Sequence, residues 1–127
     1  EIIAENDQEN IPYYPYMNGQ FVFKNAVVRF SEVINEGLQE NNLTPLDINM
    51  LIPHQANLRI SQFVQKQFKL SDDKVYNNIQ RYGNTTAASI PIALTEAWEE
   101  GKIKEGDLVV LAAFGSGFTW GSAIIKW

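Results

Sequence analysis

The sequence predicts a single α/β domain, in which helices connect the strands of one sheet. Three observations support this fold class. Helix-like and strand-like segments alternate along the chain, two of the helix-like segments carry an apolar stripe, and the tail holds two strand-like runs around a glycine-rich turn. The chain has 127 residues, which is enough for one hydrophobic core. Its hydrophobic share of 45% is that of an ordinary globular domain, so we expect most of the chain to fold.

Residues 1–20 are predicted to form a lead-in arm, and residues 21–127 the domain itself. The arm is polar at first and then rich in proline and tyrosine, with a short strand expected near Tyr14–Met17 and a turn at Asn18-Gly19. The sequence begins with Glu1 instead of methionine. We therefore expect either a processed product or an excised part of a longer protein.

The next three elements are predicted from the spacing of apolar residues. A first helix is expected to end near Asn41-Asn42, and a second to span Ala56–Phe68. Between them, the apolar run 48–53 ends in proline and is typical of a buried strand. The two helical stripes consist of Phe23, Val27, Phe30, Ile34 and Leu38, and of Ile60, Phe63, Val64 and Phe68.

The remaining elements complete the order helix, strand, helix, strand, helix, strand, strand. Residues 74–79 are expected to form a short strand and residues 86–100 a helix, with a kink or a locally broken hydrogen bond at Pro91 because proline has no N–H. The runs on either side of "GSG" are predicted to pair as an antiparallel hairpin. The helix at 86–100 is apolar around most of its circumference, which predicts that a second layer, from another domain or chain, covers its outer face.

Composition excludes several kinds of site. The chain has no cysteine and one histidine, which rules out a disulfide framework and a thiolate or multi-histidine metal site, so we expect no metal. A formal net charge of −5 repels phosphate and argues against nucleic acid as a partner. The longest apolar run, residues 108–114, is far shorter than the ~20 residues of a membrane span, and no signal peptide is recognisable.

Two polar residues are predicted to meet at one edge of the sheet. His54 follows the strand at 48–53, and Asn84 lies between the strand at 74–79 and the helix at 86–100. Ligands of open α/β sheets bind at the carboxyl ends of the strands, so we expect the two side chains to share a crevice. A neutral imidazole and an amide both donate N–H groups, and the start of the helix adds a partial positive charge. Together they can stabilise a negatively charged oxygen, such as that of an enolate.

Each of these residues, taken singly, also has a simpler structural interpretation. A histidine after a strand often binds a backbone carbonyl, and an asparagine after glycine often forms a turn or a helix N-cap. The segment "GSG" is ordinarily a hairpin turn, and Arg59 on a helix face is ordinarily a solvated charge. Only the combination of segments favours a functional site.

Three segments together resemble a known family. "IPHQANLRI", "RYGNTTAASIPIAL" and "AFGSGFTWGSAIIKW" are similar, in this order, to the C-terminal half of beta-ketoacyl-acyl-carrier-protein synthase III, a member of the thiolase superfamily. The resemblance covers about residues 17–127. It implies the C-terminal half of the thiolase-like α/β fold, with the order βαβαβαββ and a five-stranded mixed sheet. It also implies a decarboxylating condensing enzyme, which joins an acyl-CoA primer to malonyl-acyl-carrier protein to start fatty-acid synthesis.

The resemblance assigns roles to individual residues. His54 and Asn84 match the family's catalytic pair, which binds the thioester oxygen of malonyl-acyl-carrier protein during decarboxylation. Phe114 matches an aromatic residue near this pair. Ser116 stands where the family usually has a glycine whose backbone N–H belongs to a second oxyanion hole. The segment for binding acyl carrier protein and its pantetheine corresponds to Gln55, Ala56, Asn57, Leu58 and Arg59, and Lys66 adds a basic group near the face of Arg59.

The chain departs from the family in lacking the cysteine nucleophile, which belongs to the N-terminal half. The resemblance therefore implies that a longer protein carries the cysteine and that this chain alone is inactive. It further implies a cytoplasmic homodimer that needs no cofactor, because CoA and phosphopantetheine thioesters are substrates. The single histidine distinguishes the chain from the elongating synthases of the superfamily, which use two.

Two other classes of function stay open at this point. One is a hydrolase with Ser116 as nucleophile and His54 as base, although "GSG" lacks the spacing of the G-x-S-x-G nucleophile elbow. The other is a non-catalytic association module, or a specialised polyketide-type domain, which dimerises through the apolar helix at 86–100.

Overall fold

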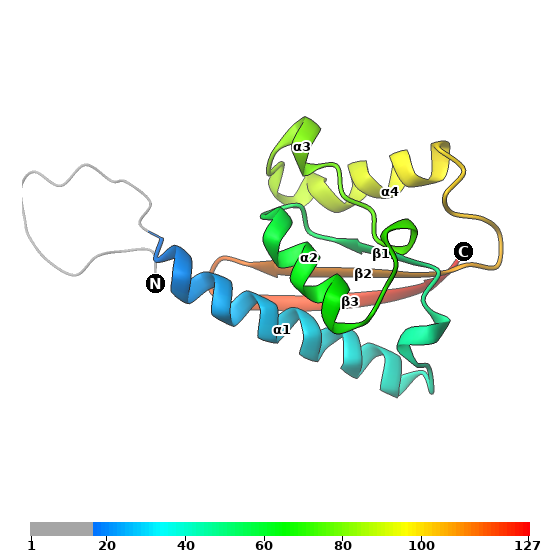
Figure 1. The fold of residues 1–127 in the computed structure, drawn as a ribbon, viewed down its shortest axis with the longest axis horizontal. Helices are drawn as coiled ribbons and strands as arrows, with labels where there is room; N and C mark the ends of the chain where they lie inside the picture. Colours follow the sequence, from blue (N-terminus) through cyan, green and yellow to red (C-terminus); the bar gives the residue numbers. More distant parts are fainter. Residues whose placement is uncertain (1–16) are drawn as a thin grey trace, which may run out of the picture.

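A computed structural model describes residues 17–127 as three layers, with a β-sheet between two groups of helices (Figure 1). Helices α1 and α2 cover one face of the sheet, and α4 covers the other. None of the helices in this part of the chain is long and apolar enough to cross a membrane. The helices and strands, in chain order, are α1 (Gly19–Glu40), β1 (Met50–Pro53), α2 (Leu58–Gln67), α3 (Ile79–Tyr82), α4 (Ser89–Glu99), β2 (Leu108–Gly115) and β3 (Thr119–Lys126).

The sheet has the strand order β1-β2-β3. β1 runs parallel to β2, and β2 runs antiparallel to β3. The antiparallel pair is joined by the turn that contains "GSG", so the predicted hairpin is confirmed. Parallel strands need a long crossover, which α2, α3 and α4 provide between β1 and β2. The predicted α/β class is therefore confirmed as well.

Alternate residues of the strands point into two separate hydrophobic cores. Leu51 and Val110 face α1 and α2, whereas Ile52 and Val109 face α4. All four residues of β1 are buried. A strand that is buried on both faces has no polar side, which explains why this segment is a continuous apolar run. The predicted buried strand at 48–53 is thus confirmed as Met50–Pro53.

The prediction of a strand over 74–79, and with it of a five-stranded sheet, differs from the structure. Within residues 17–127 the sheet has three strands, and this segment contributes one isolated parallel bridge between Val75 and Leu51. Beyond the bridge, the backbone N–H groups of Asn78 and Ile79 donate to the side-chain oxygen of Gln55, at 3.0 and 3.1 Å. A buried side chain thus takes the place of a neighbouring strand, which the sequence pattern did not indicate.

A side-chain cap determines where α1 begins. The predicted turn at Asn18-Gly19 is wrong, because Asn18 is the N-cap of α1 and its side-chain oxygen accepts a hydrogen bond from Phe21 N at 3.1 Å. The predicted end of α1 is confirmed, with Asn41 as its C-cap. Of the strand expected near Tyr14–Met17, only Met17 is among the described residues, and it lies in neither a helix nor a strand.

The helix predicted over 86–100 is divided into a 3-10 helix, Thr86–Ala88, and α4. Pro91 is the third residue of α4, where backbone N–H groups have no partner within the helix. The predicted loss of a helical hydrogen bond at Pro91 therefore does not occur. Ala93 and Ala97 are fully buried against the sheet, whereas Trp98 on the other side is 55% exposed. Residues 17–127 do not supply the second layer expected over that side.

Gly37 allows α1 to approach β3 closely. A Cβ atom at this position would lie 3.0 Å from the hydroxyl of Ser122 and 3.3 Å from Ile124, and the same hydroxyl donates to the carbonyl of Val33 at 2.8 Å. Gly37→Val is therefore expected to lower the free energy of unfolding by about 1–3 kcal/mol, as other overpacked sites do. Gly19→Val is the control, because nothing lies within 4 Å of a Cβ there. Equal losses for both variants, measured by urea unfolding of the protein, would show that the close approach is unimportant.

Candidate active site

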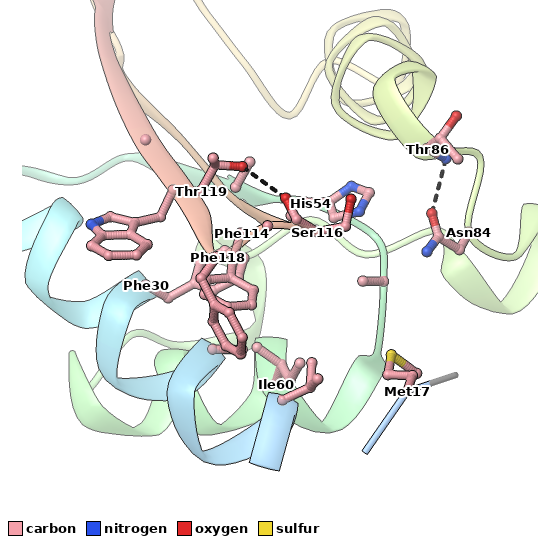
Figure 2. A pocket seen from close by; sticks show the side chains of 18 of the residues that line it. Met17, Phe30, His54, Ile60, Asn84, Thr86, Phe114, Ser116, Phe118 and Thr119 are labelled. Carbon is pink, nitrogen blue, oxygen red and sulfur yellow. Dashed lines mark hydrogen bonds between the residues drawn. The ribbon is translucent and has the colours of Figure 1, made fainter. Parts of the chain in front are cut away.

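His54 directly follows β1 and continues its pairing with β2. Its backbone N–H donates to the carbonyl of Ala112 at 2.8 Å, and its own carbonyl accepts from the N–H of Ala56 at 2.9 Å. These two bonds fix the backbone at the carboxyl end of β1. The half-buried imidazole is thereby held at this edge of the sheet, beside the turn that contains Ser116 (Figure 2).

Asn84 lies between α3 and the 3-10 helix Thr86–Ala88. The chain turns just before it at Gly83, whose φ of +68° is accessible to glycine at little cost. The side-chain oxygen of Asn84 accepts a hydrogen bond from Thr86 N at 2.9 Å. Because the oxygen must face this donor, the NH2 group of the amide points away from Thr86 and towards the side on which His54 lies (Figure 2).

One cavity of about 900 Å³ brings these two side chains together. His54 lines it from the end of β1, and Asn84 lines it from the loop before α4. Phe114 and Ser116 line the same cavity from the end of β2 and from the turn that follows. Four residues predicted from three separate segments of the sequence therefore surround a single space.

The aromatic side of the cavity is built around Phe114, which is 8% exposed. Its ring stacks on that of Trp120, with 6.4 Å between ring centres and an angle of 13°. It also meets Phe118 edge-on at 5.5 Å. Ser116 is exposed, and its carbonyl accepts from the hydroxyl of Thr119 at 3.2 Å. The hairpin thus gives the cavity a packed apolar wall with a polar turn at its end.

The predicted carrier-binding segment divides into residues with different surroundings. Ala56 lines the cavity. Gln55 is buried, and its amide is used in hydrogen bonds to the backbone, so its side chain does not face a ligand. Asn57 is the N-cap of α2, and its side-chain oxygen accepts from the N–H of Arg59 at 2.9 Å. Asn57, Leu58 and Arg59 are not among the residues that line the cavity, and Arg59 is exposed on α2.

Burial determines the protonation state of His54. Loss of hydration disfavours the imidazolium ion, so burial lowers the pKa of His54 below its ordinary 6.5. The ring is then neutral at neutral pH and keeps one N–H donor. Residues 17–127 contain no group of three His, Cys, Asp or Glu side chains that could hold a metal ion. The arrangement is chemically suited to stabilising negative charge on an oxygen that both donors reach.

The motifs did not predict much of the cavity wall. Met17 lines it from just before α1 and Phe21 from the first turn of α1, and Phe118 and Trp120 line it from the hairpin. The two hairpin residues fall within "AFGSGFTWGSAIIKW", and their place next to Ser116 is a signal that identifies them. Met17 and Phe21 carry no such signal, because this part of the chain meets the hairpin only after folding. There the ring centres of Phe21 and Phe118 lie 5.5 Å apart.

Comparison with known proteins gives a consistent result. Residues 38–127 match the family model described as 3-oxoacyl-[acyl-carrier-protein (ACP)] synthase III C terminal. A beta-ketoacyl-[acyl-carrier-protein] synthase III of Caldanaerobacter subterraneus is 54% identical over 112 residues, which cover 88% of this chain and 34% of that protein. The protein of the same name from Clostridioides difficile is 53% identical over 111 residues, with 87% and 34% covered. The chain thus spans about a third of the length of the curated relatives that it matches.

Solved structures with the same fold carry the same kind of name. The synthase III of Thermus thermophilus superposes with a TM-score of 0.89 at 44% identity, over 94% of this chain and 37% of that one. The 3-oxoacyl-[acyl-carrier-protein] synthase III of Aquifex aeolicus superposes with a TM-score of 0.87 at 46% identity, over 90% and 37%.

Proposed function

Because the chain belongs to the family of 3-oxoacyl-[acyl-carrier-protein] synthase III C-terminal domains, we propose that it forms the C-terminal half of a decarboxylating condensing enzyme. The enzyme joins an acyl-CoA primer to malonyl-acyl-carrier protein and thereby starts fatty-acid synthesis. The observation that carries this proposal is the single cavity lined by His54 and Asn84. The rest of the protein adds the remaining strands of a thiolase-like fold and the layer over the outer side of α4.

His54 and Asn84 act on the malonyl group. Each donates an N–H to the carbonyl oxygen of the malonyl thioester. The bond between the α-carbon and the carboxylate breaks, carbon dioxide leaves, and the electron pair moves onto the thioester oxygen as an enolate. The donors stabilise the charge where it develops, in a cavity partly shielded from water. The enolate carbon then attacks the acyl group held on a cysteine, and the cysteine leaves as a thiolate.

The cysteine belongs to another part of the protein, since none of the 127 residues is a cysteine. This chain supplies the donors and a basic surface for docking. Arg59 and Lys66 are both exposed on α2, where an acidic carrier protein can bind them. The proposed assembly is a homodimer, and it needs no cofactor because the thioester carriers are substrates.

The proposal is tested by incubating the full-length protein with an acyl-CoA and malonyl-acyl-carrier protein. We expect one 3-oxoacyl product for each carbon dioxide released, and no product from residues 1–127 alone. Hydrolysis of the thioesters without condensation would contradict the proposal, as would condensing activity of the isolated chain.

The pH dependence of decarboxylation is expected to follow the depressed pKa of His54. Burial favours the neutral ring, so the donor pair stays intact when the pH falls below the 6.5 of an ordinary imidazole. The acid limb of the decarboxylation rate is therefore expected to have its midpoint below pH 6.5. The pKa of His54 is higher in the unfolded chain than in the folded protein, so protonation of this ring favours unfolding. The free energy of unfolding is therefore expected to decrease as the pH falls below 6.5. A midpoint above 6.5 would contradict a neutral donor.

A further inference from the structure

The position of Asn84 depends on a helix that is too short to be stable by itself. α3 has four residues, Ile79–Tyr82, and Asn84 follows after Gly83. A single turn of helix does not persist in water, because the first turn fixes several backbone angles for very few hydrogen bonds. Contacts with the rest of the protein must therefore hold α3, and Asn84 with it.

At its N-terminal end, α3 is held by Gln55, the residue that follows His54. The side-chain oxygen of Gln55 accepts hydrogen bonds from the backbone N–H groups of Asn78 and Ile79, at 3.0 and 3.1 Å. Its side-chain nitrogen donates to two backbone carbonyls, at 2.7 and 3.3 Å. The side chain is 3% exposed, so water does not compete for these bonds. One amide thus links the loop of His54 to the helix that leads to Asn84.

On its flank, α3 is held by Glu96 of the neighbouring α4 (Figure 1). The carboxylate accepts hydrogen bonds from the amide of Asn78 at 2.8 Å, from the guanidinium of Arg81 at 2.7 Å and from the hydroxyl of Tyr82. The bonds from Asn78 and Tyr82 lower the pKa of Glu96, so it is ionised at neutral pH. Its side chain is 17% exposed, which leaves the bonds partly shielded. Three residues of one short segment therefore converge on one carboxylate.

We propose that Glu96 is a positioning residue, which fixes α3 and thereby directs the Asn84 amide at the substrate oxygen. This inference rests on the proposed function, because it concerns the geometry of the same donor pair. Glu96 is not among the residues that line the cavity, so it acts through Asn84 and not on the substrate. Gln55 fixes the N-terminal end of α3, and Glu96 fixes its side and its C-terminal end. Displacing a donor by about 1 Å can lower a rate by about 10²-fold.

Glu96→Ala in the full-length protein is expected to lower kcat for malonyl thioester decarboxylation about 10- to 100-fold, with little change in KM. Glu96→Gln keeps the shape and an acceptor oxygen but loses the charge that attracts Arg81, so we expect an intermediate rate. Acylation of the enzyme by acyl-CoA is expected to be unchanged in both. Glu99→Ala is the matched control, because Glu99 is exposed on the same helix, and it is expected to behave as the wild type.

The decisive comparison is Glu96→Ala in the background of Asn84→Ala. If Glu96 acts through Asn84, removing it is expected to lower kcat little further once the amide is gone. A full additional loss would show that Glu96 acts in another way and would overturn the inference. The Glu96→Gln variant carries the same comparison if thermal unfolding shows that Glu96→Ala does not fold.

Different results would overturn the proposed function and the positioning role of Glu96. Wild-type decarboxylation by His54→Ala and Asn84→Ala would overturn the proposed function. Loss of decarboxylation in those two variants, together with a wild-type rate in Glu96→Ala, would overturn only the positioning role.

Discussion

Replacing His54 with alanine in the full-length protein is expected to lower the rate of malonyl thioester decarboxylation about 10²- to 10³-fold, the usual effect of losing one oxyanion donor. Asn84→Ala is expected to have an effect of the same order. In the proposed reaction both donors bind charge that develops only as carbon dioxide leaves, so the loss is expected in kcat more than in substrate binding. The measurement is release of carbon dioxide from malonyl-acyl-carrier protein.

Two controls make this expectation specific. Acylation of the enzyme by acyl-CoA should survive in both variants, because the proposed cysteine nucleophile is not one of these 127 residues. Asn41→Ala changes an exposed asparagine that caps the far end of α1, and it should leave both steps intact. If the His54 and Asn84 variants failed in acylation as severely as in decarboxylation, the assignment of this pair to the malonyl half-reaction would be wrong.

The largest effect on stability is expected from Leu51→Ala. Leu51 is fully buried in the middle of β1, and its side chain packs into the core beneath α1 and α2. Its backbone carbonyl accepts a hydrogen bond from Tyr76 N at 3.0 Å. Its truncation leaves a cavity that the three layers cannot readily fill, so we expect a loss of about 2–5 kcal/mol in the free energy of unfolding. Urea unfolding of the full-length protein measures this loss.

The matched control is Leu46→Ala, which removes the same atoms from a side chain that is 88% exposed. It is expected to change the free energy of unfolding by less than about 0.5 kcal/mol. Similar losses for the two variants would contradict the burial of Leu51 in the core beneath α1 and α2.

The elements that the sequence predicts well are those whose own residues carry the pattern. β1 is apolar at every position because both of its faces are covered. The hairpin is indicated by the two strand-like runs on either side of "GSG". The segment 74–79 mixes apolar residues with Lys74, Asn77 and Asn78, and it pairs at Val75 alone. The difference lies in the buried amide of Gln55, which is distant in sequence and takes the next backbone N–H groups. Such a contact exists only after packing and leaves no period in the sequence.

The candidate site divides in the same way. His54 and Asn84 were expected to share a crevice because His54 follows a strand and Asn84 precedes a helix at the carboxyl edge of the sheet. In the structure the two residues line one cavity. The supports of Asn84 were not predicted, because Glu96 reaches Asn78 across 18 positions and from a different helix. Gln55 stands inside the motif that carries His54, but the motif alone does not tell a ligand contact from a structural bond. The structure separates these roles through burial and hydrogen bonding.

The most direct test of the account is a crystal structure of the full-length protein bound to a non-hydrolysable malonyl thioester analogue. We expect one ring nitrogen of His54 and the side-chain nitrogen of Asn84 to lie about 2.7–3.1 Å from the same carbonyl oxygen of the analogue. An analogue whose thioester oxygen bonds to neither side chain, or to groups in a different cavity, would contradict the central claim.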